Sequence, residues 1–251
     1  MSNSFGHKSV FDLLEAVTWH KDLASAPLGA FSWGIATGKA ADDVLARATH
    51  VVQVHGNAVI AASEIHSNHD EKPKNPASRP NADGVYSAKS GQILAVKTAD
   101  CLPVLFSANG AKAFAMAIHA GWRGFCAGIL AEGLRQAALN GIASENMSVI
   151  IGPAISGQRF EVGPEVLAAL MDHSGPEEAA LYTHKGLFDR WHADLQTGAV
   201  LELLRLGIKP QNITVVRVCT YESKLPSYRR EGKGCGRLVS WVETRANKAA
   251  T

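Results

Sequence analysis

Two apolar runs near the middle of the chain constrain its fold more than any other part of the sequence. The first, residues 93–106 (ILAVKTADCLPVLF), is rich in branched side chains and is interrupted at residues 98–101. The second, residues 113–119 (AFAMAIH), runs directly into the glycine-containing turn AGWRG. Short apolar runs bounded by turn residues are typical of buried strands, so we expect both runs to lie in a sheet inside the protein.

The remaining segments predict helices and strands in mixed order. A polar stretch with three prolines, residues 63–82, predicts a long exposed loop. Because helices and strands do not alternate strictly and no linker divides the chain, we expect a single α/β (α+β) domain over residues 1–251 with mixed sheets. The expected helices are residues 10–19, 125–139, 164–171 and 194–206, and the further strands are 48–59 (one strand or a pair), 149–151 and 213–218.

The charge balance and the opening residues exclude several classes of protein. Lys and Arg number 25 against 23 Asp and Glu, a net charge of +2, whereas a nucleic-acid-binding protein usually carries a large basic excess. The opening MSNSFGHKSVFDLLEAVTWH holds acids where a signal peptide needs an apolar core, and no apolar run approaches a membrane span. Four scattered cysteines predict reduced thiols. We therefore expect a cytoplasmic protein without nucleic-acid or membrane partners, and a monomer by default.

Three residues of the types that bind zinc stand where the chain changes direction. They are His55 in QVHGN, Cys101 in TADCLP and His119 in IHAGWRG. Two imidazoles and a thiolate with an open fourth position make up a catalytic zinc site. The spacing alone does not identify a known site, and a turn cap, a small buried thiol and a strand-end histidine are equally ordinary interpretations.

The turn that follows His119 has the composition of an anion site. Gly121 and Gly124 open the turn, a helix is expected from residue 125, and Arg123 lies between the glycines. Free N–H groups at a helix start and an arginine suit a phosphate group. An ordinary strand-to-helix turn with a surface arginine explains the same residues, and the phosphate-binding P-loop motif does not occur in the chain.

The segment SYRREGKGCGR, near the end of the chain, concentrates basic residues among glycines. It contains Arg229, Arg230, Lys233 and Arg237, preceded by Tyr228. A solvated basic segment is one interpretation, and a second anion-binding element with a stacking tyrosine is the other.

Two carboxylates adjoin the candidate ligands in the sequence. Asp83 lies in NADGVYS, and Asp100 directly precedes Cys101. Either could orient a ligand histidine through its second ring nitrogen, and either could simply form a turn.

Taken together and in order, six segments resemble the YfiH-like laccase-domain ("polyphenol oxidase") family, whose members include purine nucleoside phosphorylases of peptidoglycan-editing type. The segments are QVHGN, ADGVYS, TADCLPVLF, IHAGWRGFCAGIL, IGPAISGQRFEVG and CTYESKLPSYRREGKGCGR, and they extend from about residue 53 to residue 237. The pairing of TADC-x-P with HAGWRG is highly specific.

The resemblance implies a four-layered α/β/β/α domain, as in the cytotoxic-necrotizing-factor/YfiH-like fold, with one zinc per chain on His55, Cys101 and His119. Copper can occupy such a site in vitro but is not the expected metal. The implied activities are phosphorolysis of adenosine, inosine and methylthioadenosine, and deamination of adenosine. Members of the family have also been linked to peptidoglycan editing.

Near its N-terminus the chain departs from the family. Members usually have an arginine-containing GGVS-like turn and an SLNLG-like stretch, where this chain has the shorter FSWGIATGKAADDV. We therefore expect part of the usual ligand pocket to be missing or supplied by other residues.

The leading hypothesis is a zinc-dependent purine nucleoside enzyme that binds a nucleoside and phosphate. Its expected catalytic residues are Cys101, His119 and Arg123, and its expected phosphate contacts are Arg123, Gly124, Arg229 and Arg230. A multicopper laccase is rejected because the ten histidines include no H-x-H pair.

Two other classes of protein remain as alternatives. One is a hydrolase or amidase acting on a cytoplasmic peptidoglycan precursor, with Cys101 as nucleophile and His119 as base. The other is a binding protein with a structural zinc, which normally needs four protein ligands, whereas only three good candidates are visible.

Overall fold

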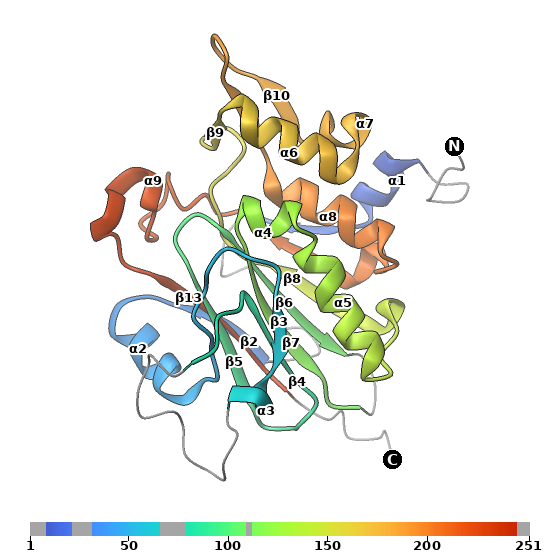
Figure 1. Ribbon diagram of the computed structural model, residues 1–251, viewed down its shortest axis with the longest axis vertical. Helices are drawn as coiled ribbons and strands as arrows, with labels where there is room; N and C mark the ends of the chain where they lie inside the picture. Colours follow the sequence, from blue (N-terminus) through green and yellow to red (C-terminus); the bar gives the residue numbers. More distant parts are fainter. Residues whose placement is uncertain (1–8, 22–31, 66–78, 109–111, 245–251) are drawn as a thin grey trace.

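The computed structural model describes residues 9–21, 32–65, 79–108 and 112–244, and its centre is a seven-stranded mixed sheet (Figure 1). In spatial order the strands are β1 (Thr18–His20), β12 (Ile213–Val216), β8 (Met147–Ile151), β6 (Leu102–Ala108), β7 (Ala115–Ala120), β4 (Gly84–Ser87) and β3 (Val59–Ala61). Strands β8, β12 and β1 are parallel to one another. Strand β6 is antiparallel to both β8 and β7, and β4 is antiparallel to β7 and parallel to β3.

Two small antiparallel sheets accompany the large one. The first consists of β2 (Ser32–Ala36), β13 (Leu238–Glu243) and β5 (Ile93–Thr98), with β13 in the middle. The second consists of β10 (Thr183–Lys185), β11 (Trp191–Ala193) and β9 (Glu161–Val162).

Helices cover the outer faces of the sheets. Helices α5 and α8 lie on one side of the large sheet, and α2 lies on the opposite side of the molecule, against the sheet of β2, β13 and β5 (Figure 1). The helices are α1 (Val10–Glu15), α2 (Gly38–Arg47), α3 (Ala62–Ile65), α4 (Trp122–Cys126), α5 (Ile129–Leu139), α6 (Pro164–Ser174), α7 (Pro176–Ala179), α8 (Leu195–Arg205) and α9 (Tyr228–Glu231), with short 3₁₀ turns at Ser144–Asn146, Pro210–Asn212 and Gly232–Gly234.

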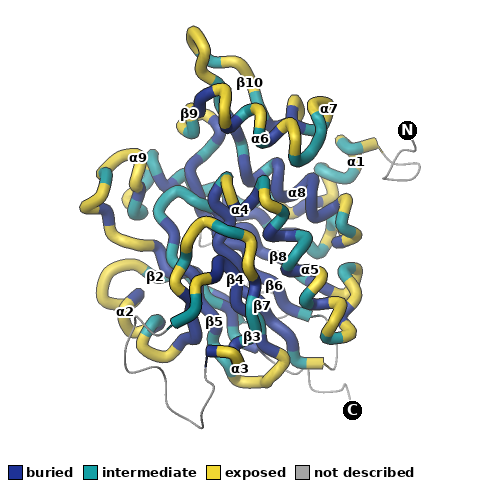
Figure 2. The backbone as a smooth tube through the Cα atoms, viewed as in Figure 1, coloured by how far each residue is buried: buried dark blue, intermediate teal, exposed yellow. Residues whose placement is uncertain are grey.

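The alternation of side chains along the strands builds one core on each side of the large sheet. In β6, Val104 and Phe106 face the helices, whereas Leu105 between them faces the small sheet, where it packs in one cluster with Leu94 and Val242. A third cluster joins α2 to the far face of the small sheet. The buried backbone accordingly runs through the middle of the molecule (Figure 2). The predicted mixed α/β fold, with its four layers α/β/β/α, is confirmed.

Several of the predicted boundaries are wrong. The expected helix 10–19 ends at Glu15, because residues 18–20 pair with β12 as strand β1. The expected helix 125–139 is two helices, since Gly128 adopts a positive φ of 78° between them. The expected strand at 48–59 is mostly irregular, and only its last residue enters β3.

The expected loop 63–82 begins inside α3, and its residues 66–78 lie outside the described ranges. No helix in the part of the chain that the structure describes has the length and apolar character needed to cross a membrane.

Candidate metal centre

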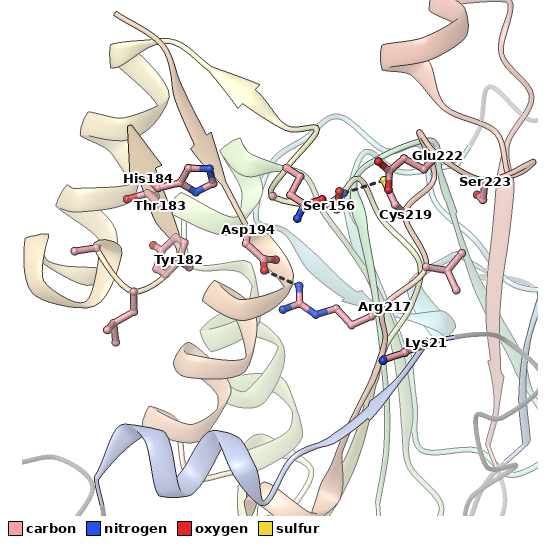
Figure 3. Close-up of a pocket in the computed structure, with 15 residues that line it drawn as sticks. Lys21, Ser156, Tyr182, Thr183, His184, Asp194, Arg217, Cys219, Glu222 and Ser223 are labelled. Atoms are coloured by element: carbon pink, nitrogen blue, oxygen red, sulfur yellow. Dashed lines mark hydrogen bonds and ion pairs between the residues drawn. The ribbon is translucent and has the colours of Figure 1, made fainter. Parts of the chain in front are cut away.

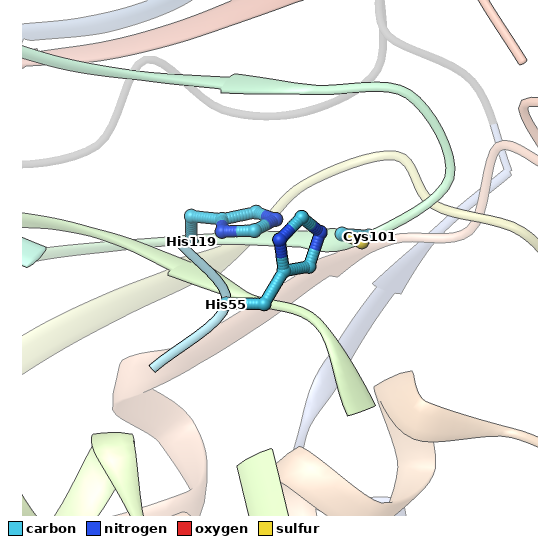
Figure 4. A group of neighbouring side chains, drawn as sticks. All are labelled: His55, Cys101 and His119. Atoms are coloured by element: carbon cyan, nitrogen blue, oxygen red, sulfur yellow. The ribbon is translucent and has the colours of Figure 1, made fainter. Parts of the chain in front are cut away.

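The three predicted ligands meet at one edge of the large sheet. His119 lies at the carboxyl end of β7, Cys101 immediately precedes the antiparallel strand β6, and His55 lies in the loop before β3. Because β6 and β3 begin at the edge where β7 ends, the topology alone places the three residues together. One candidate ligand atom of each lies within 4.8 Å of the others (Figure 4). Among the described residues, this is the one group of three or more such side chains with this geometry.

Asp83 organises the two histidines of this group. It lies just before β4, again at the same edge, and is fully buried. Its Oδ1 accepts hydrogen bonds from the backbone N–H of His55 at 2.9 Å and from Nδ1 of His119 at 2.8 Å, and its Oδ2 accepts from the N–H groups of Val54 and Gly56 at 3.2 and 2.7 Å. With Nδ1 of His119 donating to the carboxylate, Nε2 is the nitrogen left for a metal. Asp83 therefore has the orienting role that the sequence left open between two carboxylates.

The backbone of the QVHG loop depends on the same carboxylate. His55 adopts a left-handed conformation with φ of 63°, which is unfavourable for a residue with a side chain. Three consecutive N–H groups that point at Asp83 hold the loop in this shape, so one buried carboxylate fixes both the His55 backbone and the His119 ring.

Gly121 keeps open the space beside the ligands. A Cβ at this position would lie 3.0 Å from Cδ2 of His55 and 3.2 Å from Sγ of Cys101. Gly124 has a different reason to be glycine, because its Cβ would lie 2.5 Å from the carbonyl oxygen of Gly56 in the QVHG loop. The donor set of two imidazoles and one thiol, with room beside it, fits a single borderline-soft metal ion such as zinc.

The group is also electrostatically coupled. Burial alone would raise the pKa of the Cys101 thiol, but hydrogen bonds to His119 and His55 outweigh it and lower the pKa to about 7. Burial alone would lower the pKa of His119, but its hydrogen bonds to Asp83 and Cys101 raise it to about 9. Without a metal, the arrangement therefore favours a thiolate beside an imidazolium ion.

A cavity of about 710 Å³ opens onto this group. Its wall combines aromatic rings with an excess of positive charge, since five cationic side chains line it against one aspartate, Asp100. The aromatic residues are Trp122, Phe160 and Tyr228, and the cations are Arg79, Lys97, Arg123, Arg229 and Arg237.

Two of the expected phosphate contacts line this cavity. Arg123 is exposed and its guanidinium lies 4.3 Å from the ring centroid of Trp122. Arg229 lies over the ring of Phe160, and its guanidinium donates hydrogen bonds to the carbonyl oxygens of Arg159 and Glu161 at 3.3 and 3.0 Å.

The other two expected contacts, Gly124 and Arg230, are not among the residues that line the cavity. The guanidinium of Arg230 donates instead to four backbone carbonyls of its own neighbourhood, those of Thr220, Tyr221, Ser223 and Leu225, at 2.6 to 2.9 Å. Its position gives it a structural role in this segment.

Asp100 binds the same C-terminal region and not a ligand histidine. Its Oδ1 accepts a hydrogen bond from Oγ1 of Thr220 at 2.6 Å, and its Oδ2 accepts from the backbone N–H of Arg229 at 2.6 Å. Asp100 therefore ties the segment before Cys101 to the basic segment of the chain.

Two cations that line the cavity, Arg79 and Lys97, are not among the residues that the sequence indicated. The sequence pattern around Lys97 could have indicated a polar site, because a lysine inside the apolar run ILAVKT has to find a polar environment. The pattern around Arg79 could not, since a single basic residue in a polar stretch is common on protein surfaces.

A second cavity of about 760 Å³ lies near the carboxyl ends of β1 and β12 (Figure 3). Its main charges are paired: Nη1 of Arg217 lies 2.5 Å from Oδ2 of Asp194, and Glu222 accepts a hydrogen bond from Arg159 at 2.7 Å. Cys219 accepts a hydrogen bond from the N–H of Ser156 at 3.4 Å. The lining of this second cavity contains none of the three candidate metal ligands.

A family model and the sequences of known proteins identify the same family as the resemblance in the sequence. A family model described as multi-copper polyphenol oxidoreductase laccase matches residues 34–245. The purine nucleoside phosphorylase YfiH of Escherichia coli (strain K12) is 37% identical over 205 residues, covering 81% of this chain and 76% of that protein. A purine nucleoside phosphorylase of Corynebacterium glutamicum is 31% identical over 218 residues, covering 84% and 85%.

Solved structures agree with the fold. The Neisseria meningitidis protein NMB0706 superimposes with a TM-score of 0.69 at 30% identity, covering 82% of this chain and 78% of that one. The Bacillus licheniformis protein YfiH superimposes with a TM-score of 0.70 at 23% identity, covering 82% and 79%, and this likeness concerns the fold alone.

Proposed function

The chain belongs to the multi-copper polyphenol oxidoreductase laccase family, and we propose that it is a zinc-dependent purine nucleoside phosphorylase within it. One observation carries the proposal: a His/Cys/His group, oriented by a buried carboxylate, opens onto a cavity lined by aromatic rings and cations. The names of its relatives support the same activity. The proposed substrates are adenosine, inosine and methylthioadenosine, with deamination of adenosine as a second activity of the cavity.

The ligand set argues against a multicopper oxidase. Several coppers need many ligands, whereas the described residues provide one group of three, and the full sequence has no H-x-H pair. A thiolate and two imidazoles are suited to one zinc ion. When bound, zinc supplies a Lewis acid that polarises a neighbouring oxygen.

The residues of the chain perform the remaining tasks. Asp83 keeps a proton on Nδ1 of His119 and thereby fixes the direction of the ring. Phe160, Tyr228 and Trp122 offer apolar faces on which a purine can stack. Arg123 and Arg229 add positive charge that attracts phosphate.

Phosphorolysis places definite demands on such a cavity. An oxygen of phosphate forms a bond to C1′ of the ribose while the bond between C1′ and the purine nitrogen breaks, and the departing base takes up a proton. The cavity must therefore hold a flat apolar base and a phosphate anion at the same time, and a volume of about 710 Å³ is within the range of small-molecule sites, about 300–1,000 Å³.

The test combines metal analysis with product analysis. We expect the purified protein to contain one zinc per chain and to release adenine from adenosine only when phosphate is present. Cys101→Ala should lose both zinc and turnover, whereas Cys126→Ala, which alters a thiol outside the group, should keep both. Full activity in zinc-free Cys101→Ala protein would contradict the proposal, and release of ammonia without free base would indicate deamination alone.

A second candidate, a cysteine hydrolase, is favoured by one specific observation. Cys101, His119 and Asp83 form a linked thiol–imidazole–carboxylate series, the arrangement that activates a nucleophilic cysteine. Because a metal-bound thiolate is a poor nucleophile, the two candidates exclude each other at Cys101. Stoichiometric alkylation of Cys101 with inactivation of the protein as purified would favour the hydrolase, and protection of Cys101 by zinc would favour the phosphorylase.

A further inference from the structure

Three cations lie together on one wall of the metal-site cavity. Lys97 lies in β5 and is half-buried, Arg237 directly precedes β13, and Arg79 precedes β4. All three line the cavity. Among the described residues, no carboxylate forms an ion pair with any of them, in contrast to the paired charges of the second cavity.

The pairing of strands accounts for the closeness of two of these cations. In the antiparallel pair of β5 and β13, Lys97 lies opposite Val239, so Arg237, two residues earlier, is its diagonal neighbour on the same face of the sheet. Diagonal neighbours lie about 7–8 Å apart, within reach of long side chains. Burial lowers the pKa of Lys97, and the positive charges of Arg79 and Arg237 lower it further.

The other two cations of the cavity lie apart from this group. The guanidinium of Arg229 donates to two backbone carbonyls, and that of Arg123 stacks on Trp122. Arg237 also has neutral acceptors, since its Nη1 donates to the carbonyl oxygens of Cys235 and Gly236 at 3.0 and 2.9 Å and to Sγ of Cys235 at 3.0 Å, but these acceptors do not neutralise its charge. Asp100, the one acidic side chain of the lining, is occupied by Thr220 and by the N–H of Arg229. Like charges held together without a counter-ion are costly, and an anion with several acceptor oxygens would relieve that cost.

We propose that Lys97, Arg79 and Arg237 form a subsite for a phosphate group on the wall of the metal-site cavity. The subsite deepens the proposed function, on which its catalytic meaning rests, because it assigns the phosphate to the β5–β13 wall and not to the turn around Arg123. The phosphate is either the inorganic co-substrate or an ester group on the nucleoside, since the same three cations would bind both.

Binding of inorganic phosphate tests the subsite without any assay of turnover. Phosphate, compared with chloride at equal ionic strength, should raise the unfolding temperature of the metal-loaded protein, because a ligand that binds only the folded state stabilises it. Lys97→Met and Arg237→Gln should each weaken phosphate binding about tenfold or more, the value of a charge-assisted hydrogen bond. Lys97→Arg should restore most of it, and Lys209→Met, an exposed cation outside the cavity, should leave it unchanged.

Kinetics and nucleotide binding separate the two sources of phosphate. If inorganic phosphate is the ligand, Lys97→Met raises the KM for phosphate and leaves the KM for adenosine within about twofold. If an ester is the ligand, adenosine 5′-monophosphate binds more tightly than adenosine, and Lys97→Met removes the difference.

The outcomes distinguish failure of the subsite from failure of the proposed function. Phosphorolysis with an unchanged KM for phosphate, together with unchanged binding of phosphate and of nucleotide in both variants, overturns the subsite and leaves the phosphorylase intact. A Lys97-dependent phosphate effect on unfolding, in a protein without phosphorolysis, supports the subsite and contradicts the phosphorylase.

Discussion

Nδ1 of His119 lies 2.8 Å from Oδ1 of Asp83, and the carboxylate that receives this hydrogen bond also accepts three backbone N–H groups of the QVHG loop. Two of the three candidate metal ligands, His55 and His119, are therefore positioned by one buried side chain. The centre is consequently sensitive to a residue that binds no metal itself.

Asp83→Asn should reduce zinc affinity about 10- to 100-fold, the usual effect of removing the partner of a ligand histidine. The amide can accept from fewer of the four donors and bears no charge to hold the proton on Nδ1. Competition with a chromophoric chelator measures the change. Asp100→Asn is the matched control, because Asp100 contacts Thr220 and Arg229 and should leave zinc affinity unchanged; equal losses in both variants would contradict the assigned role.

Gly121→Ala should abolish metal binding while the fold survives. The added methyl would lie 3.0 and 3.2 Å from the side chains of His55 and Cys101, in the space beside the ligands. Crowding of this kind costs about 1–3 kcal/mol, which a domain of this size tolerates. Zinc content and circular dichroism test the prediction, and Gly234→Ala, where a Cβ meets nothing within 4 Å, should retain full zinc.

The cysteines of the metal-free protein should differ sharply in reactivity with pH. The thiolate is the reactive form, and it predominates above the pKa. With a pKa of about 7, half of the Cys101 thiol should be thiolate near pH 7. Burial, followed by the charges of Glu202 and Asp172, raises the pKa of Cys126 to about 11, so Cys126 stays a thiol at this pH. Iodoacetamide at pH 8 followed by peptide mass spectrometry should therefore label Cys101 before Cys126, and zinc should protect Cys101.

Between about pH 7 and pH 9, this centre should make the stability of the metal-free protein nearly independent of pH. The lowered pKa of Cys101 adds stability that grows as pH rises from about 7 to the ordinary thiol value of 9.0, whereas the raised pKa of His119 adds stability that shrinks as pH rises from the ordinary imidazole value of 6.5 to about 9. The two effects cancel in this window, because the folded and the unfolded states bind the same number of protons. Cys101→Ala removes the thiol contribution, and since Asp83 still raises the pKa of His119, the stability of this variant should fall as pH rises from about 7 to about 9. Urea unfolding at several pH values gives both profiles, and an equally flat profile in the variant would show that His119 contributes nothing.

The sequence predicted the strands around the centre because their apolar runs are long and their turns are marked by glycine. It also singled out His55, Cys101 and His119 as candidate ligands at places where the chain changes direction, and the structure brings these three side chains together. These features are local, and local patterns can be recognised without knowing what they pack against.

The parts that the sequence did not reveal depend on contacts between distant segments. The neighbourhood of Lys97 and Arg237 exists only because β13 pairs with β5, and the choice of Asp83 over Asp100 depends on which of them lies beside β7. Trp19 was expected in a helix, but pairing of residues 18–20 with β12 prevailed over the local helical pattern. Tertiary contacts determine these features, so they cannot be predicted from periodicity and composition.

Arg230→Met should lower the free energy of unfolding and leave the KM for phosphate unchanged, in contrast to Lys97→Met. The guanidinium of Arg230 donates to the carbonyl oxygens of Thr220, Tyr221, Ser223 and Leu225, and methionine would leave all four without this donor. Since the group is partly exposed, water replaces some of the lost bonds, and we expect a loss of about 2–3 kcal/mol.

Chemical unfolding and phosphate kinetics on the same preparation check both halves of this prediction. Lys233→Met, three residues later and exposed, is the control for loss of positive charge in this segment. If Arg230→Met instead raised the KM for phosphate and kept the stability of the protein, Arg230 would be a phosphate contact, as expected from the sequence, and the assignment of phosphate to Lys97, Arg79 and Arg237 would be contradicted.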